Sequence, residues 1–272
     1  MFPITLTSLM ASELRCVRAA GLLPCRRLDC HAFDERSTVL KAVTGEASTE
    51  TEGVVRLVFI IADLAGYTAL TEAHGGDEAA TTVARYRELA EQALGDGARV
   101  IEQVGDQLLI VADDPRAAIV TAVRLRAAVA DEPHFLSVRV GIAEGTVVQR
   151  GGRYFGPALN LTARLASRAG ADEILCTAMV ARACGTVDGL IFKDLGAQRF
   201  RNVPEPVVVS MVVSQQAAHH GVVVDPVCWM HLDPGTAPAR LPFGDSTYQF
   251  CSFACAQAFA NNPGNYGRNP PQ

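Results

Sequence analysis

The chain has 272 residues, of which 49% are hydrophobic, and a formal net charge of -5. This length allows one large domain and one small domain, and this composition can build a substantial apolar core. The weakly acidic balance provides no broad positive field, so we expect no nucleic-acid partner. The apolar runs are too short to cross a bilayer, and Glu13 interrupts the N-terminal stretch where a signal peptide would stay apolar. We therefore expect a cytoplasmic protein with no membrane partner.

Composition shifts divide the chain into four regions. Residues 1–52 show no sustained periodicity and end in the polar run TGEASTETEG, so we expect a poorly ordered N-terminal extension. Residues 53–214 alternate apolar strands with helices and should form the large domain. Residues 215–222 are a predicted linker, and residues 223–268 are a predicted small module rich in cysteine.

The eight cysteines do not have the spacing of a disulfide framework. Three of them lie near a histidine in the N-terminal extension, but their spacings match no common zinc pattern. We therefore expect no metal at these positions, which are Cys16, Cys25, Cys30 and His31.

The first half of the large domain is predicted to begin with a buried strand at 55–63. A helix should follow over 77–94, with Asp77 as a plausible N-cap. Residues 98–104 and 107–113 should form a hairpin around Gly105 and Asp106. A second helix is predicted over 114–130, with Pro115 in its first turn.

The second half should contain a strand and its partner across a turn within 135–149. A third helix is predicted over 157–170, ending at Gly170. Short strands complete the domain at 174–176, 190–195 and 207–213. This strand–helix–strand–strand–helix–strand order predicts an α+β sheet of ferredoxin-like type, with its helices layered on one side.

Two aspartates stand at the ends of apolar strands, beside turns that contain glycine. Asp63 lies in VFIIADLAGYT, and Asp106 lies in VIEQVGDQLLIV. Hard divalent ions prefer carboxylate oxygens, and phosphate groups prefer free backbone N–H donors. The pair therefore suits a metal–phosphate site, although each aspartate alone is also typical of an ordinary strand-end turn.

With a third segment, YFGPALNLTARL at 154–165, the chain resembles the class III nucleotide cyclases, the catalytic domain of adenylate and guanylate cyclases. ADLAGYTALTEAHGG is similar to the family's first metal-aspartate segment, and VGDQLLIV is similar to the second. FKDLGAQRFRNVPEPVVV is similar to the family's closing hairpin. The resemblance runs from about Val54 to Val213. It implies the ferredoxin-like class III cyclase fold and conversion of a nucleoside triphosphate to its 3′,5′-cyclic nucleotide and pyrophosphate.

The resemblance also implies a role for each matching residue. Asp63 and Asp106, with the backbone of Leu64, would hold two Mg²⁺ or Mn²⁺ ions per active site. Asn160 would orient the ribose, and Arg164 would stabilise charge on the transferring phosphate. The positions implied to bind the other phosphates are Gly66, Tyr67, Thr68 and Arg201.

In this family the metal aspartates come from one subunit, and the residues for base, ribose and transition state come from its partner. This chain carries both sets. The resemblance therefore implies a head-to-tail homodimer with two composite sites, and a nucleoside triphosphate as the substrate.

The sequence departs from adenylate cyclases at the two base-recognition positions, where it has Glu102 and Arg153. Guanine accepts at O6 and donates at N1 and N2. Glu102 can accept from the two donors and Arg153 can donate to O6, so the pair favours GTP over ATP. Two alternatives stay open: use of ATP or of both nucleotides, or a catalytically degenerate module that binds nucleotide or dimerises and is coupled to a metal sensor.

The C-terminal region carries DPVCWM at 225–230, FCSFAC at 250–255 and NPGNY at 262–266. These motifs resemble the YHS domain, a small metal-associated module. About 45 residues bury little apolar surface, and a bound metal often supplies the missing stability.

Three cysteines of this region are candidate metal ligands. Cys251 and Cys255 are four residues apart, so they would share one face of a helix, and Cys228 would supply a third thiolate. Zn²⁺, or another soft metal, usually takes four ligands. The fourth ligand is open between His231, Asp225, Asp245 and water, and the alternative is that the thiols are small core residues.

Overall fold

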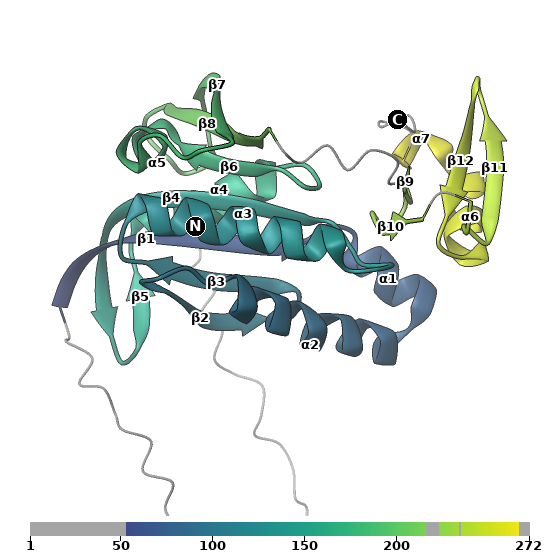
Figure 1. Cartoon of the computed structure of the whole chain (residues 1–272), viewed down its shortest axis with the longest axis horizontal. Coiled ribbons are helices and arrows are strands. Elements are labelled where there is room, and N and C mark those ends of the chain that lie inside the picture. The colour runs from purple at the N-terminus through teal and green to yellow at the C-terminus, as the bar shows by residue number, and fades with distance from the viewer. Residues whose placement is uncertain (1–52, 216–222, 234, 267–272) are drawn as a thin grey trace, which may run out of the picture. The chain divides into compact units, whose positions relative to one another are not determined.

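The structure is a computed structural model that describes residues 53–215, 223–233 and 235–266 (Figure 1). The predicted N-terminal extension, with Cys16, Cys25, Cys30 and His31, lies outside these residues, as does most of the predicted linker. The described residues belong to one compact unit, which spans Ser48–Gln272. No helix in the described part of the chain is both long and apolar enough to cross a membrane.

Four antiparallel strands form one end of the sheet, in the order β2-β3-β1-β4. Their bounds are Gly53–Leu64 for β1, Ala98–Val104 for β2, Gln107–Ala112 for β3 and Val138–Arg150 for β4. Two long helices connect them, α2 at Gly76–Ala93 and α3 at Pro115–Asp131. This order of strands and helices is the ferredoxin-like arrangement that the sequence predicts.

Three further strands extend the sheet beyond β4. The strand β6 (Ile174–Thr177) is parallel to β4, and β8 (Val207–Ser214) joins it to β7 (Leu190–Gln198). Two short elements were not predicted, β5 (Arg153–Phe155), which folds back on β4, and α5 (Ala178–Cys184).

The prediction of a turn within 135–149 is wrong, because most of this stretch forms the single strand β4. It pairs with β1 along the whole length of β1. Gly141 lies inside the strand, where an added Cβ would stand 2.2 Å from the backbone nitrogen of Ala166 in helix α4 (Pro157–Arg168). A glycine in a strand can allow another backbone to approach closely, and that is its function here.

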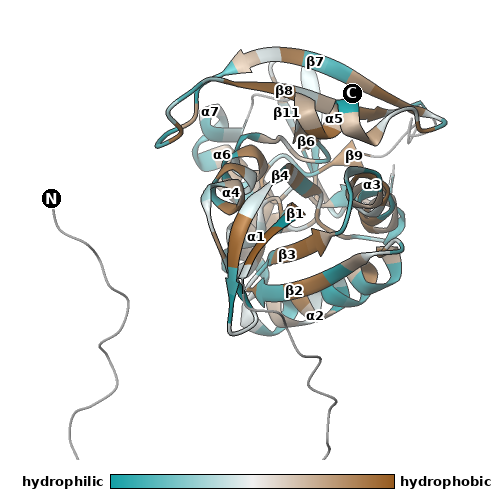
Figure 2. Cartoon of the chain, turned by 90° about the vertical axis from the view of Figure 1, so that its left-hand side faces the viewer, coloured by the Kyte–Doolittle hydropathy of each residue, from teal (hydrophilic) through white to brown (hydrophobic). Residues whose placement is uncertain are grey.

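The expectation that all helices lie on one side of the sheet is also wrong. In Figure 2, α3 and α4 lie on opposite sides of β1 and β4. Side chains alternate between the two faces of a strand. Ile60 therefore packs in the cluster that contains α2 and α3, while its neighbour Phe59 packs with Ala158 of α4.

The helix starts differ in part from the predictions. The turn expected after Asp63 leads at once into a further helix, α1 (Tyr67–His74). Helix α2 then begins after Gly75, whose φ of 87° is not a helical value. Asp77 therefore lies in the first turn of α2 and is not its N-cap. An acidic residue there still interacts favourably with the helix dipole. Pro115 is the first residue of α3, as predicted.

The C-terminal module, defined as residues 223–266, contains four short strands and two helices. They are β9 (Val223–Val224), β10 (His231–Leu232), β11 (Ala239–Phe243), β12 (Ser246–Phe250), α6 (Phe253–Asn261) and α7 (Pro263–Tyr266). Its centre is aromatic: the ring of Phe259 lies 4.8 Å from that of Tyr248 and 5.3 Å from that of Phe250. These residues belong to the same apolar cluster as the core of the large domain.

Candidate functional site

The two aspartates that the sequence singles out lie together at one end of the β1–β3 pair. Asp63 is the cross-strand partner of Gln107, and Asp106 is the residue before it. The backbone N–H of Leu64 donates to the Asp106 carbonyl at 3.4 Å. Burial and the charge of Asp63 raise the pKa of Asp106 to about 6. The strand register and the backbone bond from Leu64 bring the two carboxylates close enough to repel each other.

Asp63 is held by Arg139 of β4, a residue that the sequence reasoning missed. The two are cross-strand partners, and Arg139 Nε donates to Asp63 Oδ2 at 2.7 Å. The side chain of Asp63 is only 16% exposed. A signal was present, because Arg139 is a charged residue within the apolar stretch that forms β4. Its position opposite Asp63, however, depends on the strand register.

Tyr86 of α2 is the second residue that sequence reasoning missed. Its side chain is fully buried, and its hydroxyl has no hydrogen-bond partner among the described residues. Burial and the charges of Asp63 and Asp106 raise the pKa of Tyr86 well above its usual value. The tyrosine therefore lies within electrostatic reach of both carboxylates.

The carboxylate pair fits divalent cations. The negative charge of Asp63 is balanced by Arg139. The negative charge of Asp106 is disfavoured by burial and by repulsion from Asp63, which together raise its pKa. A cation between two carboxylates relieves such repulsion, and carboxylate oxygens are the ligands that Mg²⁺ prefers.

The turn after Asp63 contains the implied phosphate-binding positions. The N–H of Ala65 is already bonded to the carbonyl of Ser137 at 2.8 Å, and that of Leu64 to Asp106. Gly66, with a φ of 78°, immediately precedes the first residue of α1, Tyr67. The first N–H groups of a helix have no partner within the helix. The donors left for a ligand are therefore those from Gly66 to Thr68.

Asn160 and Arg164 lie one turn apart on α4, and both are exposed. This helix covers the face of the sheet opposite to α2 and α3. Within the described part of the chain, no hydrogen bond or ion pair links either residue to Asp63 or Asp106. Within one chain, the two aspartates and the pair Asn160 and Arg164 therefore form two separate groups.

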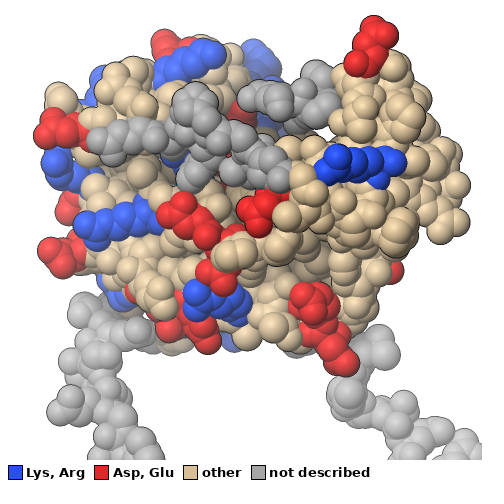
Figure 3. Space-filling model, turned by 45° about the vertical axis from the view of Figure 1, so that its right-hand side comes forward, with Lys and Arg blue, Asp and Glu red and all other residues tan. Residues whose placement is uncertain are grey.

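The other implied site residues are also exposed. Glu102 lies on β2, Arg153 begins β5, and Arg201 lies in the turn between β7 and β8. No ion pair joins Glu102 to Arg153 among residues 53–215. On the face shown in Figure 3, acidic and basic side chains are interspersed and form no continuous basic surface.

The three cysteines of the C-terminal module converge, but the prediction that Cys251 and Cys255 share one face of a helix is wrong, because Cys251 precedes Ser252, the N-cap of α6. The sulfur of Cys251 lies 3.4 Å from that of Cys228 and 3.6 Å from that of Cys255. All three are free thiols. Hydrogen bonds from the Cys228 and Cys251 thiols lower the pKa of Cys255, so one thiolate is already favoured.

Asp225 also lies in the cluster, since its carboxylate and the three sulfurs are all within 4.8 Å of one another. Its two oxygens are occupied by backbone donors. Oδ1 accepts from the N–H groups of Val227 and Cys228 at 2.8 and 3.3 Å, and Oδ2 accepts from that of Cys251 at 2.7 Å. Asp225 thus joins the two segments that carry the thiols.

The other two candidates for a fourth ligand lie outside the cluster. Asp245 is exposed in the turn between β11 and β12. The Nε2 atom of His231 is hydrogen-bonded to Ser137 Oγ and Asp172 Oδ2, each at 2.9 Å. Burial alone would raise the pKa of Asp172, but the bonds from His231 and Ser137 reverse the shift and lower it. His231 therefore docks the module and does not complete the thiol cluster.

Several known proteins with similar sequences are named adenylate cyclases. No protein-family model matches the chain. Over 161 residues it is 34% identical to an adenylate cyclase of Streptomyces griseus, a match that covers 57% of this chain and 38% of that protein. The chain thus spans less than half the length of the curated relatives it matches.

Solved structures give the same result. An adenylate/guanylate cyclase/hydrolase from Silicibacter pomeroyi is 28% identical, with a TM-score of 0.52 over 59% of this chain and 98% of that chain. The adenylyl cyclase CyaB from P. aeruginosa, 22% identical, has a TM-score of 0.53 over 61% of this chain and 98% of that chain. The chain contains the class III nucleotide cyclase fold. The likeness of the C-terminal module to the YHS domain stays a prediction.

Proposed function

We propose that the protein is a class III nucleotide cyclase that converts a nucleoside triphosphate to its 3′,5′-cyclic nucleotide and pyrophosphate. The observation that carries this proposal is the convergence of Asp63 and Asp106 in a fold shared with solved nucleotide cyclases. The name of the Streptomyces griseus relative, an adenylate cyclase, supports the same reaction class.

Asp63 and Asp106 would hold two Mg²⁺ or Mn²⁺ ions. When bound, such ions activate the attacking 3′-hydroxyl and neutralise the leaving pyrophosphate. The chain's own contribution at this end is to bind the phosphates. The free N–H donors from Gly66 to Thr68 would contact their oxygens, and Arg201 would add a fixed positive charge.

Asn160 and Arg164 would act from the second subunit of a head-to-tail homodimer. Asn160 would orient the ribose, and Arg164 would stabilise negative charge on the phosphate as the bond to oxygen forms. Their exposure on α4, without a link to the aspartates of the same chain, supports a site completed by a partner. A module that only binds nucleotide would not need an arginine at this position.

GTP is the proposed base preference, because Glu102 and Arg153 match the donors and the acceptor of guanine. The names of the similar proteins do not support GTP, since the curated relatives that are named by an activity are adenylate cyclases and the Silicibacter pomeroyi title names both activities. The side-chain polarity is therefore the argument for GTP.

The proposal predicts that the paired change Glu102→Lys with Arg153→Asp shifts preference from GTP towards ATP. Each hydrogen-bonded contact to a base is worth about 1–3 kcal/mol, so the ratio of kcat/KM for the two nucleotides should change by about 10- to 100-fold. Either single change should shift it less, because it leaves an unmatched charge facing the base. An unchanged ratio in the double variant would contradict the base-reading argument and leave the cyclase proposal standing.

The cyclase proposal is tested by incubating the purified full chain with Mn²⁺ or Mg²⁺ and either ATP or GTP, with cyclic products quantified by mass spectrometry. We expect a cyclic nucleotide from the wild type. The Asp63→Ala and Asp106→Ala variants should be folded and about 100-fold or more less active, because each lacks a metal ligand. Equal activity in wild type and both variants would reject the two-metal site.

We further propose that the C-terminal module binds Zn²⁺ or another soft metal through Cys228, Cys251 and Cys255. The sulfur–sulfur distances of 3.4 and 3.6 Å support it. Metal analysis of the wild type against the triple Cys→Ser variant tests it, and equal metal content would leave the cysteines as core residues.

A further inference from the structure

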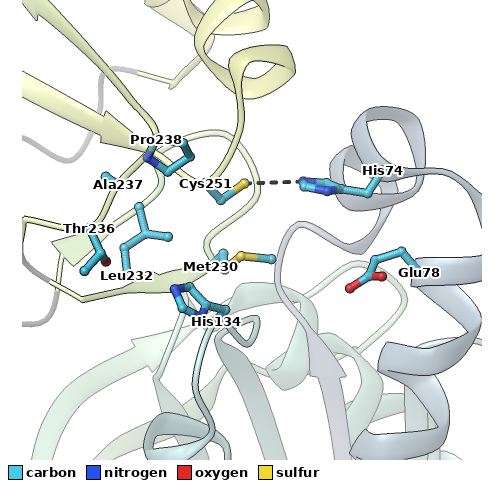
Figure 4. Close-up of a pocket in the computed structure, with 9 residues that line it drawn as sticks. All are labelled: His74, Glu78, His134, Met230, Leu232, Thr236, Ala237, Pro238 and Cys251. Carbon is cyan, nitrogen blue, oxygen red and sulfur yellow. Dashed lines mark hydrogen bonds between the residues drawn. The ribbon is translucent and has the colours of Figure 1, made fainter.

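His74, the last residue of α1, reaches the thiol cluster of the C-terminal module. Its Nε2 atom lies 3.4 Å from the sulfur of Cys251, although the two residues are 177 positions apart in the sequence (Figure 4). His74 lies in the large domain, at the end of the segment that begins with Asp63. The cluster therefore receives a nitrogen donor from outside its own module.

The three distances that centre on the sulfur of Cys251 suit tetrahedral coordination. A Zn–S bond of about 2.3 Å places two tetrahedral thiolates about 3.8 Å apart, and a Zn–N bond of about 2.0 Å places an imidazole nitrogen about 3.5 Å from each sulfur. The observed sulfur–sulfur distances are 3.4 and 3.6 Å, and the observed sulfur–nitrogen distance is 3.4 Å. The group of ligand atoms within 4.8 Å of one another contains the three sulfurs and Asp225 but not His74, so zinc bound by His74 would draw its ring from its place beside Cys251 further into the cluster.

We propose that His74 is the fourth ligand of a zinc site formed with Cys228, Cys251 and Cys255, and that zinc at this site holds the phosphate-binding turn in place. The first part of this proposal, that His74 is a zinc ligand, concerns metal binding alone. The second part deepens the proposed function, because it gives the turn between Gly66 and Thr68 a regulator.

Asp225 is the competing fourth ligand, since its carboxylate lies within 4.8 Å of all three sulfurs, whereas the contact of His74 is to Cys251. Two observations favour His74. The carboxylate oxygens of Asp225 already accept three backbone N–H bonds, which a metal would have to share. Three thiolates with a neutral imidazole also give the common Cys₃His set, whereas three thiolates with a carboxylate are not among the common structural zinc sets.

Helix α1 connects this site to the implied active site. His74 is its last residue, and Gly66 precedes its first. An added Cβ at Gly66 would lie 2.2 Å from the carbonyl oxygen of Cys228, so the turn packs directly on the backbone of a metal ligand. Both ends of this eight-residue helix therefore touch the cysteine cluster or the loop that carries it.

A second connection runs through the segment before β4. The N–H of Ala65 donates to the carbonyl of Ser137, and the N–H of Ser137 donates to the carbonyl of Trp229, at 2.8 and 3.0 Å. Ser137 thus joins the turn after Asp63 to the residue after Cys228. An ion that holds Cys228 and His74 in place would therefore restrain the turn through helix α1 and through Ser137. Loss of the ion would remove both restraints.

A cavity of about 390 Å³ lies beside the proposed site. It is lined by a second histidine that can serve as a control for substitution of His74. Figure 4 shows that His74 and His134 both line it, but only His74 is bonded to Cys251. His134 has a φ of 52°, a conformation that asparagine tolerates. His74→Asn and His134→Asn are therefore a matched pair.

The test measures the zinc dissociation constant of the full chain, by competition with a chelator, in the wild type and both variants. We expect about one tightly held zinc more in the wild type than in Cys255→Ser. His74→Asn should raise the dissociation constant about 100-fold or more, since even ligand-supporting residues contribute 10- to 100-fold, and His134→Asn should leave it unchanged. The absorption spectrum of the cobalt-substituted wild type should report three sulfur ligands and one nitrogen.

The coupling is tested by hydrogen exchange of the wild-type chain. At a free zinc concentration 100 times the dissociation constant, local opening of residues 66–74 should be suppressed by up to about 100-fold relative to zinc-free protein. Equal zinc affinity of His74→Asn and wild type, a cobalt spectrum without nitrogen, or a Cys228–Cys251 disulfide in place of the metal would overturn the site. Equal exchange with and without zinc would overturn the coupling. None of these readouts uses cyclase activity, so failure of the cyclase assay would reject only the proposed function.

Discussion

At the scale of single residues, the carboxylate pair is only half neutralised by the protein. Arg139 balances Asp63 through a short hydrogen bond, whereas Asp106 is left with a raised pKa. The pair with its arginine therefore carries a net negative charge when Asp106 is ionised. Such a charge favours binding of cations, and it makes the aspartates a source of strain in the metal-free protein.

The pKa of Asp106 predicts how the metal-free protein responds to pH. Its folded pKa of about 6 lies above the ordinary value of 3.8, so the folded state binds more protons between these values. Stability should fall as pH rises from about 4 to about 6 and change little from this source above that. Urea unfolding in a chelating buffer measures it, and Asp106→Asn should flatten the profile. An Asp106→Asn variant with the same pH dependence as the wild type would show that another group is responsible.

Tyr86 gives a second prediction at this scale. Its buried hydroxyl has no partner among the described residues and lies near two negative charges. Tyr86→Phe removes the hydroxyl and keeps the ring, so the metal-free protein should be unchanged or more stable, by up to about 2 kcal/mol. A loss of more than about 1 kcal/mol in urea unfolding would show that the hydroxyl makes a favourable bond.

Spacing in the sequence indicated Asp63 and Asp106, because apolar strands and glycine turns mark the ends where they lie. Spacing did not indicate that Arg139 contacts Asp63 or that His74 contacts Cys251. Arg139 meets Asp63 through the register of β1 and β4, and His74 meets Cys251 across 177 positions. Both contacts arise from tertiary structure. Side chains that act through such contacts have no local pattern to reveal them.

At the scale of elements, hydrophobic periodicity predicted the long strands and helices, and it failed for the short ones. A helix of seven residues or a strand of three is too short to show a period. This explains why α5 and β5 were missed. The wrong turn in β4 has a different cause, since glycine there serves the packing of α4.

That packing predicts a large effect of a small substitution. In Gly141→Ala, the added carbon meets the backbone of α4, which cannot move aside as a flexible side chain would. We expect a loss of about 1–3 kcal/mol or more. Gly76→Ala is the control, because nothing lies within 4 Å of its added carbon and it begins helix α2. Thermal unfolding of both variants measures the effect, and equal stability would mean that α4 does not lie so close to β4.

At the scale of the whole molecule, the described residues belong to one compact unit. The C-terminal module shares the apolar cluster of the large domain. Its residues Trp229 and His231 bond to the backbone of residues 135–137, just before the strand that carries Arg139. A change of state in the module therefore reaches the carboxylate pair through few intermediate contacts.

We propose that one active site takes Asp63 and Asp106 from one chain and Asn160 and Arg164 from another. Mixing two inactive variants, Asp63→Ala and Arg164→Ala, tests it most directly. A heterodimer would contain one site with both residues intact, so an equal mixture should recover about a quarter of the wild-type rate of cyclic-nucleotide formation. Each variant alone should stay inactive. If subunit exchange is demonstrated and the mixture forms no cyclic nucleotide, the shared active site is contradicted.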